Sequence, residues 1–382
     1  MKYYTFLAAL FLLVTYSCQG DGSAEAATKL PPEQEDFREA RKKWGYINKT
    51  GNLVIDTQFD DVRDFSEGLA AVQHKGAWGY IDTKGTYIIE PKYKSAWSFH
   101  EGLARVTTWG DSIRYVNLAG REVLDVPYSE AKNFHEGLAR VKIDSWYGYI
   151  TKKGKLVIPA TFSRASDFKN GYAKVKTSTK YGLIDTEGKF LVAEEYDKID
   201  VPSDQRIRFK QNGNVGFLDE GGELVIAPIF KSAIDFQEGI AAAKISDKYQ
   251  LIDLQGNVVG NRSFDGVRYG KSSRWIVENK GKFGIIDATG TIIAPIIYEQ
   301  LYEFSEERIC YSQGGLWGIM DINGKRITPP QFGLTWDFRE GLGRASFQEG
   351  VGYIYPDGTL AIAPNYSELR DFSEGLARVQ AQ

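Results

Sequence analysis

The feature that most constrains this chain is an internal repeat of 34 residues. Trp44-Gly45-Tyr46-Ile47 returns as Trp78-Gly79-Tyr80-Ile81, and further versions follow at steps of 34 residues, with a single step of 35. A second block, first seen as Phe65-Ser66-Glu67-Gly68-Leu69-Ala70, keeps the same period. About ten copies fill residues 42–382. A fixed period of this length indicates an array in which each repeat packs against its neighbours.

One repeat predicts three β-strands. The Trp-Gly block is aromatic and alternating, and it ends in an Asp/Asn-x-x-Gly turn such as Asp82 to Gly85, which is typical of a hairpin. An aliphatic strand follows, for example Leu156-Val157-Ile158, and a Pro such as Pro159 often ends it. The Glu-Gly-Leu-Ala stretch forms the third strand. It leads within about seven residues into the next Trp-Gly strand, close enough to pair with it.

The two blocks, recurring together in fixed phase, resemble the WG (or KWG) repeat family of bacterial proteins. The resemblance covers residues 42–382 and implies a fold class but no general biochemical activity. It departs where the Trp or the Gly is lost, and we expect those copies to be distorted. They are the copies at Ile113-Arg114, Val215, Gln250 and Val351.

We therefore predict an all-β fold of about ten 34-residue repeats in an open curved or spiral array. The alternative is a closed, propeller-like ring. The chain begins on a Trp-Gly strand and ends on a Glu-Gly-Leu-Ala strand, so its two ends could pair with each other. Ten small blades would leave a wide hole, and for that reason the open array is the first expectation.

The N-terminus indicates export. Lys2 precedes a nine-residue apolar run from Phe6 to Val14, which is too short for a membrane span of roughly 20 residues but suits a signal peptide. The following Ser17-Cys18 resembles a lipoprotein signal of the Bacteroidota type, in which Cys18 would carry the lipid, although Thr15 stands where Leu is usual. Ordinary cleavage near residues 24–26 is the alternative.

This N-terminal pattern predicts the organisation of the chain. Residues 1–17 are the signal peptide, residues 18–41 a lipid-anchored tether, and residues 42–382 the repeat array. The protein is expected outside the cytoplasm as a membrane-anchored lipoprotein. The outer membrane is favoured through the resemblance of the signal, whereas the side that the protein faces stays open.

Most repeated columns are assigned to packing. Aromatic columns predict a core ladder, and a Glu column predicts turn hydrogen bonds and ion pairs between repeats. A basic column lies four residues after that Glu and forms a candidate basic ladder, either for similar inter-repeat contacts or as a stripe for an anionic polymer. Its members are Arg105, Arg140, Lys174, Arg208, Arg344 and Arg378.

The likeliest contact residues stand in a column that the repeat does not dictate. It lies two residues before the Phe of Phe-x-Glu-Gly, and we call it the variable column. It includes Trp97, Tyr302 and Trp336, flanked by Arg63 and Arg370. A Trp that the core does not require is often an anchor for a sugar or a protein. The alternative is that these rings fill gaps beside weak copies.

No catalytic constellation is evident, and neither a cofactor nor a metal site is predicted. His100 and His135 share one column in adjacent copies and could approach each other, but exposed strand-edge positions are expected. Cys310 replaces a usually basic residue and is not expected to be a nucleophile. The net charge of −3 does not favour nucleic acid. The sequence predicts a non-enzymatic scaffold for a protein or glycan; the alternatives are a polysaccharide-active enzyme among decayed repeats and a passive spacer.

The lipid anchor can be tested directly. Cys18→Ser should leave the protein soluble or unprocessed, because the thioether-linked lipid that would hold it to the membrane cannot form. Fractionation and incorporation of labelled fatty acid measure this outcome. A variant that still sediments with membranes, beside a wild type that takes up no label, would contradict the lipoprotein interpretation.

Overall fold

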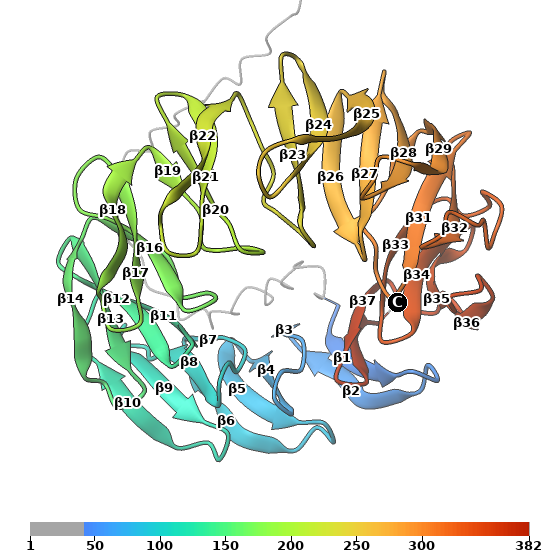
Figure 1. Cartoon of the computed structure of the whole chain (residues 1–382). Helices are drawn as coiled ribbons and strands as arrows, with labels where there is room; N and C mark the ends of the chain where they lie inside the picture. The colour runs from blue at the N-terminus through green and yellow to red at the C-terminus, as the bar shows by residue number, and fades with distance from the viewer. Residues whose placement is uncertain (1–41, 382) are drawn as a thin grey trace, which may run out of the picture. The chain divides into compact units, whose positions relative to one another are not determined.

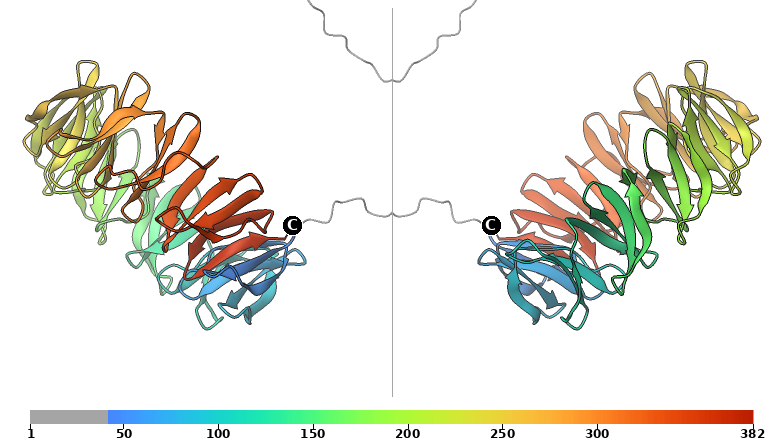
Figure 2. Two further views of the ribbon diagram at one scale, coloured as in Figure 1. Left: turned by 90° about the vertical axis from the view of Figure 1, so that its right-hand side faces the viewer. Right: turned by 90° about the vertical axis from the view of Figure 1, so that its left-hand side faces the viewer.

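The computed structural model describes residues 42–381. The predicted signal peptide, Cys18 and the rest of the predicted tether lie outside the described residues. Within residues 42–381 the strands form ten small sheets, which are arranged as the blades of a ring (Figure 1). Seen from the side, the blades form a single layer (Figure 2). This part of the chain contains no helix long and apolar enough to cross a membrane.

A complete blade has four antiparallel strands, ordered from the centre of the ring outward. The innermost strands are β3 (Asp61–Val62), β7 (Ser95–Ala96), β11 (Glu130–His135), β15 (Arg164–Ala165), β19 (Lys198–Ile199), β26 (Gly266–Lys271), β30 (Gln300–Leu301), β33 (Thr335–Arg339) and β37 (Glu368–Ser373). The second strands carry the Glu-Gly-Leu-Ala block and are β4 (Leu69–His74), β8 (Leu103–Thr107), β12 (Leu138–Ile143), β16 (Tyr172–Lys176), β20 (Ile207–Gln211), β23 (Ile240–Ile245), β27 (Arg274–Asn279), β31 (Arg308–Gln313), β34 (Leu342–Phe347) and β38 (Leu376–Gln380).

The outer half of each blade comes from the following repeat. The third strands carry the Trp-Gly block and are β1 (Trp44–Asn48), β5 (Ala77–Asp82), β9 (Ile113–Asn117), β13 (Trp146–Thr151), β17 (Tyr181–Asp185), β21 (Asn214–Leu218), β24 (Lys248–Asp253), β28 (Lys282–Asp287), β32 (Leu316–Asp321) and β35 (Gly350–Ile354). The outermost strands are β2 (Leu53–Phe59), β6 (Tyr87–Tyr93), β10 (Glu122–Val126), β14 (Leu156–Phe162), β18 (Phe190–Tyr196), β22 (Leu224–Phe230), β25 (Val258–Phe264), β29 (Ile292–Tyr298) and β36 (Leu360–Ile362).

The two ends of the chain complete one blade together. Its strand order is β2-β1-β38-β37, and Trp44 to Asn48 pair residue by residue with Gln380 to Leu376. The Glu374 carboxylate also accepts hydrogen bonds from the backbone N–H groups of Glu67 (2.7 Å) and Gly68 (2.8 Å) in the neighbouring blade. The all-β repeat prediction is confirmed. Of the two arrangements considered, the structure shows the closed ring and not the open array that was expected first. Each blade combines half of one repeat with half of the next, and the half-repeats at the two ends of the array complete each other.

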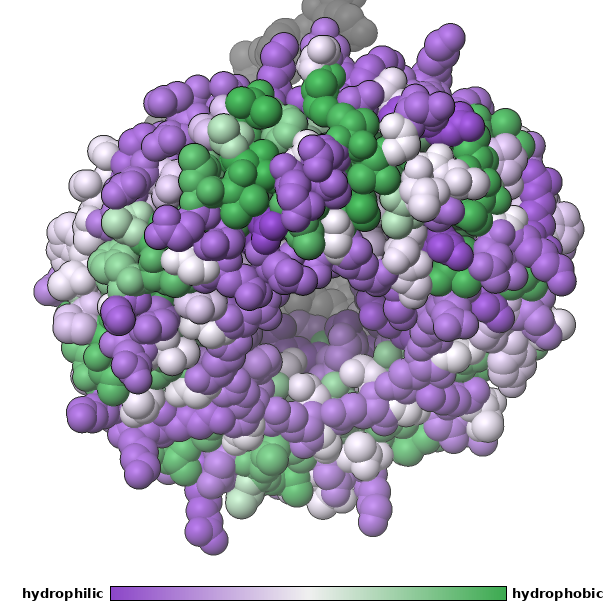
Figure 3. All heavy atoms as spheres, in the orientation of Figure 1, coloured by the Kyte–Doolittle hydropathy of each residue, from purple (hydrophilic) through white to green (hydrophobic). Residues whose placement is uncertain are grey.

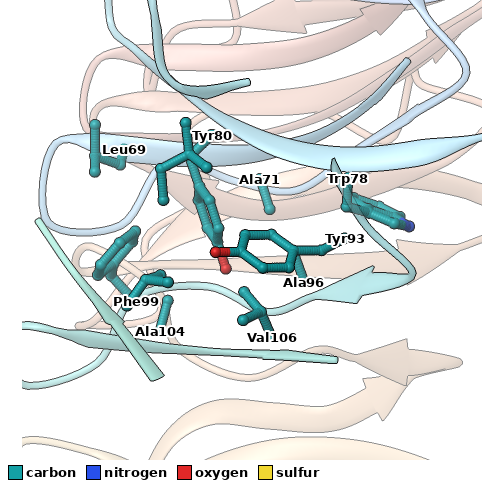
Figure 4. Close-up of a cluster of buried hydrophobic side chains, with 11 residues drawn as sticks. Leu69, Ala71, Trp78, Tyr80, Tyr93, Ala96, Phe99, Ala104 and Val106 are labelled. Atoms are coloured by element: carbon teal, nitrogen blue, oxygen red, sulfur yellow. The ribbon is translucent and has the colours of Figure 1, made fainter. Parts of the chain in front are cut away.

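The core lies between blades. In one interface, Leu69, Trp78 and Tyr80 face Phe99 and other residues of the next blade (Figure 4). The Tyr80 and Phe99 rings meet edge to face with centroids 5.0 Å apart, and the Tyr80 hydroxyl donates a 2.7 Å hydrogen bond to the Trp97 carbonyl. The same Tyr–Phe contact recurs round the ring and confirms the predicted aromatic ladder. Its copies include Tyr46–Phe65, Tyr115–Phe134, Tyr149–Phe168 and Tyr353–Phe372.

The Gly of the Trp-Gly block makes room for a bulge in the outermost strand. In the β3–β6 blade, Trp78 pairs with Tyr93 and Tyr80 with Ile89, so Gly79 alone lies opposite three residues. A Cβ on Gly79 would lie 2.4 Å from the Ile89 carbonyl oxygen. Pro91 stands in this bulge, where the ladder needs no N–H donor. The prediction that Pro ends the strand is wrong for this copy, because the strand continues to Tyr93; at Pro364 the strand does end before the Pro.

Copies that lack this Gly are irregular, as expected. Arg114 pairs directly with Asp125 and the usual bulge is missing there, whereas Gln250 lies opposite a longer bulge. The Val215 copy keeps Gly216 and the usual register, so that expectation is wrong for this copy. The Val351 copy has an outermost strand, β36, of only three residues. The β30–β32 blade lacks an outermost strand, and its outer segment contains Pro329-Pro330, which cannot donate to a ladder.

The bulge yields a stability prediction. In Gly148→Ala the new Cβ would lie 2.6 Å from the Ile158 carbonyl oxygen, and relief requires the outermost strand to move. We expect a loss of about 1–3 kcal/mol in the free energy of unfolding, measured by thermal or urea denaturation. Gly110→Ala is the matched control, since its Cβ would meet no atom closer than 3.9 Å. Equal stability of the two variants would contradict this role for the Gly.

Candidate binding site on the inner rim

The residues of the variable column lie within the innermost strands or directly after them. These strands are nearest the centre of the ring (Figure 1). On the face shown in Figure 3, the central hole is bordered mainly by hydrophilic residues. Ring closure changes the order of the candidates, because the blade of Arg370 now lies next to the blade of Arg63. The five predicted contact residues consequently occupy five consecutive blades, in the order Tyr302, Trp336, Arg370, Arg63 and Trp97.

Each of these candidates already contacts a stacking partner. The Arg105 guanidinium lies 3.8 Å from the Trp97 ring centroid, and that of Arg344 lies 4.7 Å from the Trp336 ring. The remaining pairs are Tyr302 with Trp317 (4.3 Å), Arg63 over Trp78 (5.1 Å) and Arg370 over Trp44 (5.7 Å). Arg370 is exposed and the other four candidates are half-buried. The column therefore contributes to packing and offers the rest of its surface to a partner.

Two of the three predicted aromatic residues meet in one cleft. Tyr302 and Trp336, from neighbouring blades, line a cavity of about 600 Å³. Arg344 of the basic ladder and the carboxylates of Asp337 and Asp371 also line it. Trp97 lies three blades beyond Trp336 and is not part of this cleft. The cleft thus combines aromatic surface with both hydrogen-bond donors and acceptors.

The cleft contains an acid in an unusual environment. Burial raises the pKa of Asp337; the charges of Glu303 and Asp371 add to this rise, while Arg339 and Arg344 oppose it. Burial also raises the pKa of the Tyr302 hydroxyl. The adjacent Cys310 thiol has its pKa raised to about 12 by burial, so it stays protonated at neutral pH, and it donates to the Trp336 carbonyl.

The basic ladder reaches from each blade to the next. The Arg105, Arg140 and Arg208 guanidinium groups donate to the carbonyls of Ala131, Ala165 and Ala233 in the following blades. Arg344 and Arg378 donate to Leu369 (3.4 Å) and Val62 (3.2 Å), and Lys174 binds Asp200 (3.1 Å). These contacts match the interpretation as inter-repeat bonds. Use of the ladder by an anionic polymer stays a prediction.

The Glu column makes a second set of contacts between blades. The Glu101 carboxylate accepts from the N–H groups of Glu136 (2.5 Å) and Gly137 (3.0 Å) in the next tight turn. Glu67, Glu136, Glu306 and Glu340 make the corresponding bond to Gly102, Gly171, Gly341 and Gly375. These carboxylates stabilise turns and are committed to the scaffold.

Other candidates from the sequence do not form a site. The His100 and His135 rings lie together, with centroids 4.4 Å apart, and both side chains are half-buried rather than exposed. Residues 42–381 contain no group of three or more His, Cys, Asp or Glu side chains that could hold a metal ion. The sequence argument missed Trp109, which is 63% exposed in the β8–β9 hairpin loop. The sequence feature that could have revealed Trp109 was the single step of 35 residues, because the inserted residue lengthens the part of the chain that contains this loop.

Comparison with known proteins identifies the family to which the chain belongs. The family described as "WG containing repeat" matches residues 44–76, 78–108, 113–145, 147–180, 181–214, 216–249, 283–317, 317–350 and 352–381. The chain belongs to this WG-repeat family, which confirms the resemblance. The Gln250 copy is the one that this match leaves out. No curated protein sequence matches the chain significantly.

Solved structures add information on the fold alone. The chain is similar to a structure described as the eukaryotic initiation factor, at 13% identity and a TM-score of 0.50, over 76% of this chain and 93% of the other. It is also similar to BamB from Moraxella catarrhalis, at 13% identity and a TM-score of 0.33, over 60% and 80%. Identities this low do not carry an activity from one protein to another.

The raised pKa of Asp337 predicts a pH-dependent stability. In the unfolded chain Asp337 ionises near its ordinary pKa of 3.8, whereas in the folded protein it ionises at a higher pH. Between these two pKa values the unfolded state releases the Asp337 proton more readily, so the free energy of unfolding falls as pH rises through this range. Asp337→Asn, which cannot ionise, should therefore melt higher than wild type at pH 7. The difference should vanish near pH 3.

The control for this prediction is Asp371→Asn. Asp371 pairs with Arg344 at 2.6 Å, so its neutralisation should lower the melting temperature at pH 7. Scanning calorimetry at both pH values measures the two variants. An Asp337→Asn variant that is less stable than wild type at pH 7 would mean that the ionised carboxylate is stabilised, contrary to this assignment.

Proposed function

We propose that this protein is a non-enzymatic binding scaffold, exported and held to a membrane by a lipid on Cys18, with its partner bound at the inner rim. The partner is a protein or a glycan. The observation that supports the proposal is the run of five variable-column residues on consecutive blades. The Tyr and Phe columns of the core ladder are buried between blades, whereas the variable column is the one whose residue type the repeat leaves free to vary.

The Tyr302–Trp336 cleft is the centre of the proposed site. One face of Trp336 is covered by Arg344, and the remaining indole surface can pack against the C–H face of a sugar or an apolar side chain. Asp337 and Asp371 offer oxygen acceptors to hydroxyl or amide groups, and Arg268 offers donors from the preceding blade. A cavity of about 600 Å³ is large enough for one or two sugar rings or a few side chains.

A second candidate function is hydrolysis of a polysaccharide. The observation in its favour is that Asp337, with a raised pKa, shares the cleft with Asp371 and an aromatic ring. Glycosidases pair a protonated acid with an ionised carboxylate in this way. If the cleft binds a glycan, Asp337→Asn distinguishes the two functions. Loss of sugar release with retained binding would support the enzyme, and no sugar release by wild type would support the scaffold.

The proposal is tested with two Trp variants. Affinity purification with the full-length protein as bait, from membrane extracts and on a glycan array, identifies the partner. Trp97→Ala and Trp336→Ala should each weaken its binding by about tenfold or more, as truncated aromatic anchors do. Each should cost only about 1 kcal/mol in the free energy of unfolding, since the loss is mainly one exposed-edge cation–π contact.

Trp109→Ala is the matched control, because Trp109 is exposed but lies outside the variable column. It should leave binding unchanged. If Trp109→Ala abolishes binding while the other two variants bind normally, the contact surface lies on the hairpin loops. If the ring captures no partner at all, the passive spacer is the better description.

A further inference from the structure

A second cleft lies on the opposite side of the ring from Trp336 and has a different chemistry. It has a volume of about 390 Å³ and spans the β11–β14, β15–β18 and β19–β22 blades. Its charged lining residues are Arg140, Arg164, Lys174, Lys198 and Asp200, four cations and one anion. The side chains of Tyr147 and Tyr181 provide its aromatic surface.

Two pairs of like charge lie across the strands at this cleft. In the β15–β18 blade, Arg164 is directly opposite Lys176; in the β19–β22 blade, Lys198 is directly opposite Lys210. Like charges in this position destabilise a sheet. None of the six corresponding pairs in other blades brings two like charges together. These pairs are Asp61–Gln73, Ser95–Thr107, Glu130–Lys142, Gly266–Glu278, Gln300–Ser312 and Glu368–Gln380.

The described part of the chain does not neutralise these four cations. Within residues 42–381, none of Arg164, Lys176, Lys198 and Lys210 has a carboxylate within ion-pair distance. The single acid of the cleft, Asp200, is engaged by Lys174 (3.1 Å) and Arg208 (2.8 Å). Burial alone would raise the pKa of Asp200, but these two cations hold it below its usual range.

The basic surface continues beyond one blade. A smaller cleft of about 220 Å³ adjoins the first and shares Lys198 and Asp200 with it. Lys210 and Lys231 also line this smaller cleft. Beside the larger cleft, the Lys176 ammonium lies 5.0 Å from the centroid of the Tyr181 ring, which lines that cleft, so an aromatic face stands next to the uncompensated charges. The cations are thus arranged along a line across neighbouring blades rather than round a single point.

We propose that this double cleft binds a linear acidic polysaccharide, whose regularly spaced carboxylate or sulfate groups pair with Arg164, Lys176, Lys198 and Lys210. Repeated cation pairs on successive blades suit a polymer with repeated anions better than a single small anion. The tyrosine rings give a sugar ring a surface on which to pack.

This site is separate from the Tyr302–Trp336 cleft, and the two proposals can fail independently. The probes are polygalacturonate oligosaccharides and dextran sulfate, with neutral dextran and single-stranded DNA of matched charge as comparisons. Titration calorimetry with the full-length protein in mild detergent measures the affinity at two salt concentrations. We expect at least one acidic polysaccharide to bind, neutral dextran not to bind, and the affinity to fall as salt rises.

The decisive variant is Arg164→Gln/Lys198→Gln. It should weaken binding of the acidic polysaccharide by about tenfold or more, because it removes one cation from each pair. Lys153→Gln/Lys189→Gln is the matched control, since these exposed lysines lie in the outer turns of two of the same blades. Trp336→Ala should leave this binding unchanged. Equal losses in the two double variants would show a general charge effect and overturn the proposal.

A stability measurement separates a ligand site from an ordinary solvated surface. Lys176→Gln removes a like-charge contact with Arg164, so without ligand it should raise the melting temperature by about 1 °C while weakening polysaccharide binding. A variant that binds as tightly as wild type would overturn the proposal. Tighter binding of single-stranded DNA than of either polysaccharide would equally overturn it and point to a nucleic acid.

Discussion

The ring depends on the antiparallel pairing of β1 with β38. The sequence repeat runs from a Trp-Gly strand to a Glu-Gly-Leu-Ala strand, but a blade combines the second half of one repeat with the first half of the next. An open chain would therefore end in two half-blades, each with an unpaired edge of backbone N–H and C=O groups. Pairing Trp44 to Asn48 with Gln380 to Leu376 removes both edges at once.

The contacts that recur between blades share one direction, which suits a closed ring. The Tyr80 hydroxyl, the Arg105 guanidinium and the Glu101 carboxylate each reach toward the blade that follows in sequence. A single hydrogen bond of this kind contributes about 1 kcal/mol, so no single interface holds the ring. In a closed ring every blade has a following blade. The Glu374 carboxylate accepts from Glu67 N–H and the Arg378 guanidinium donates to the Val62 carbonyl, both in the first repeat.

Sequence reasoning recovered what a single repeat determines. The period, three of the four strands of a repeat, the hairpin turns and the aromatic ladder follow from residues that recur, such as Tyr80 and Phe99. The innermost strand was missed, because in many blades it is only two residues long. The choice between ring and open array depends on the rotation between blades, which no single residue sets. The register between the third and outermost strands could not be predicted from the sequence either. Gly79 faces three residues of the outermost strand, and this bulge explains why a Gly is needed there and why Pro91 is tolerated.

The candidate sites were only partly visible for a similar reason. Tyr302 and Trp336 could be selected because they break a column, but their shared cleft depends on which blades are neighbours. Arg164 and Lys176 are twelve residues apart and belong to unremarkable basic positions. Their direct opposition appears only once the strand register is known. The Asp337 environment likewise depends on Glu303 and Asp371, which come from the two adjacent blades.

Substitutions on the inner rim show why the Tyr302–Trp336 cleft exists. At Ala71 and Ile276 the basic ladder carries no cation. In these blades an Arg in or directly after the facing innermost strand takes its place. Arg63, beside Ala71, donates to the Ala96 carbonyl, and Arg268, opposite Ile276, donates to the Leu301 carbonyl. In these two blades a guanidinium therefore reaches the next blade from the variable column instead of from the basic ladder.

The pair Tyr302 and Cys310 supplies no such group. The short Cys310 thiol makes only a 3.7 Å contact to the Trp336 carbonyl, where other blades place a long Arg side chain. A cysteine in place of an arginine leaves volume unfilled, and the cleft of about 600 Å³ lies beside this interface. The absence of a ladder cation at Cys310 thus coincides with the aromatic cleft that the proposed function uses.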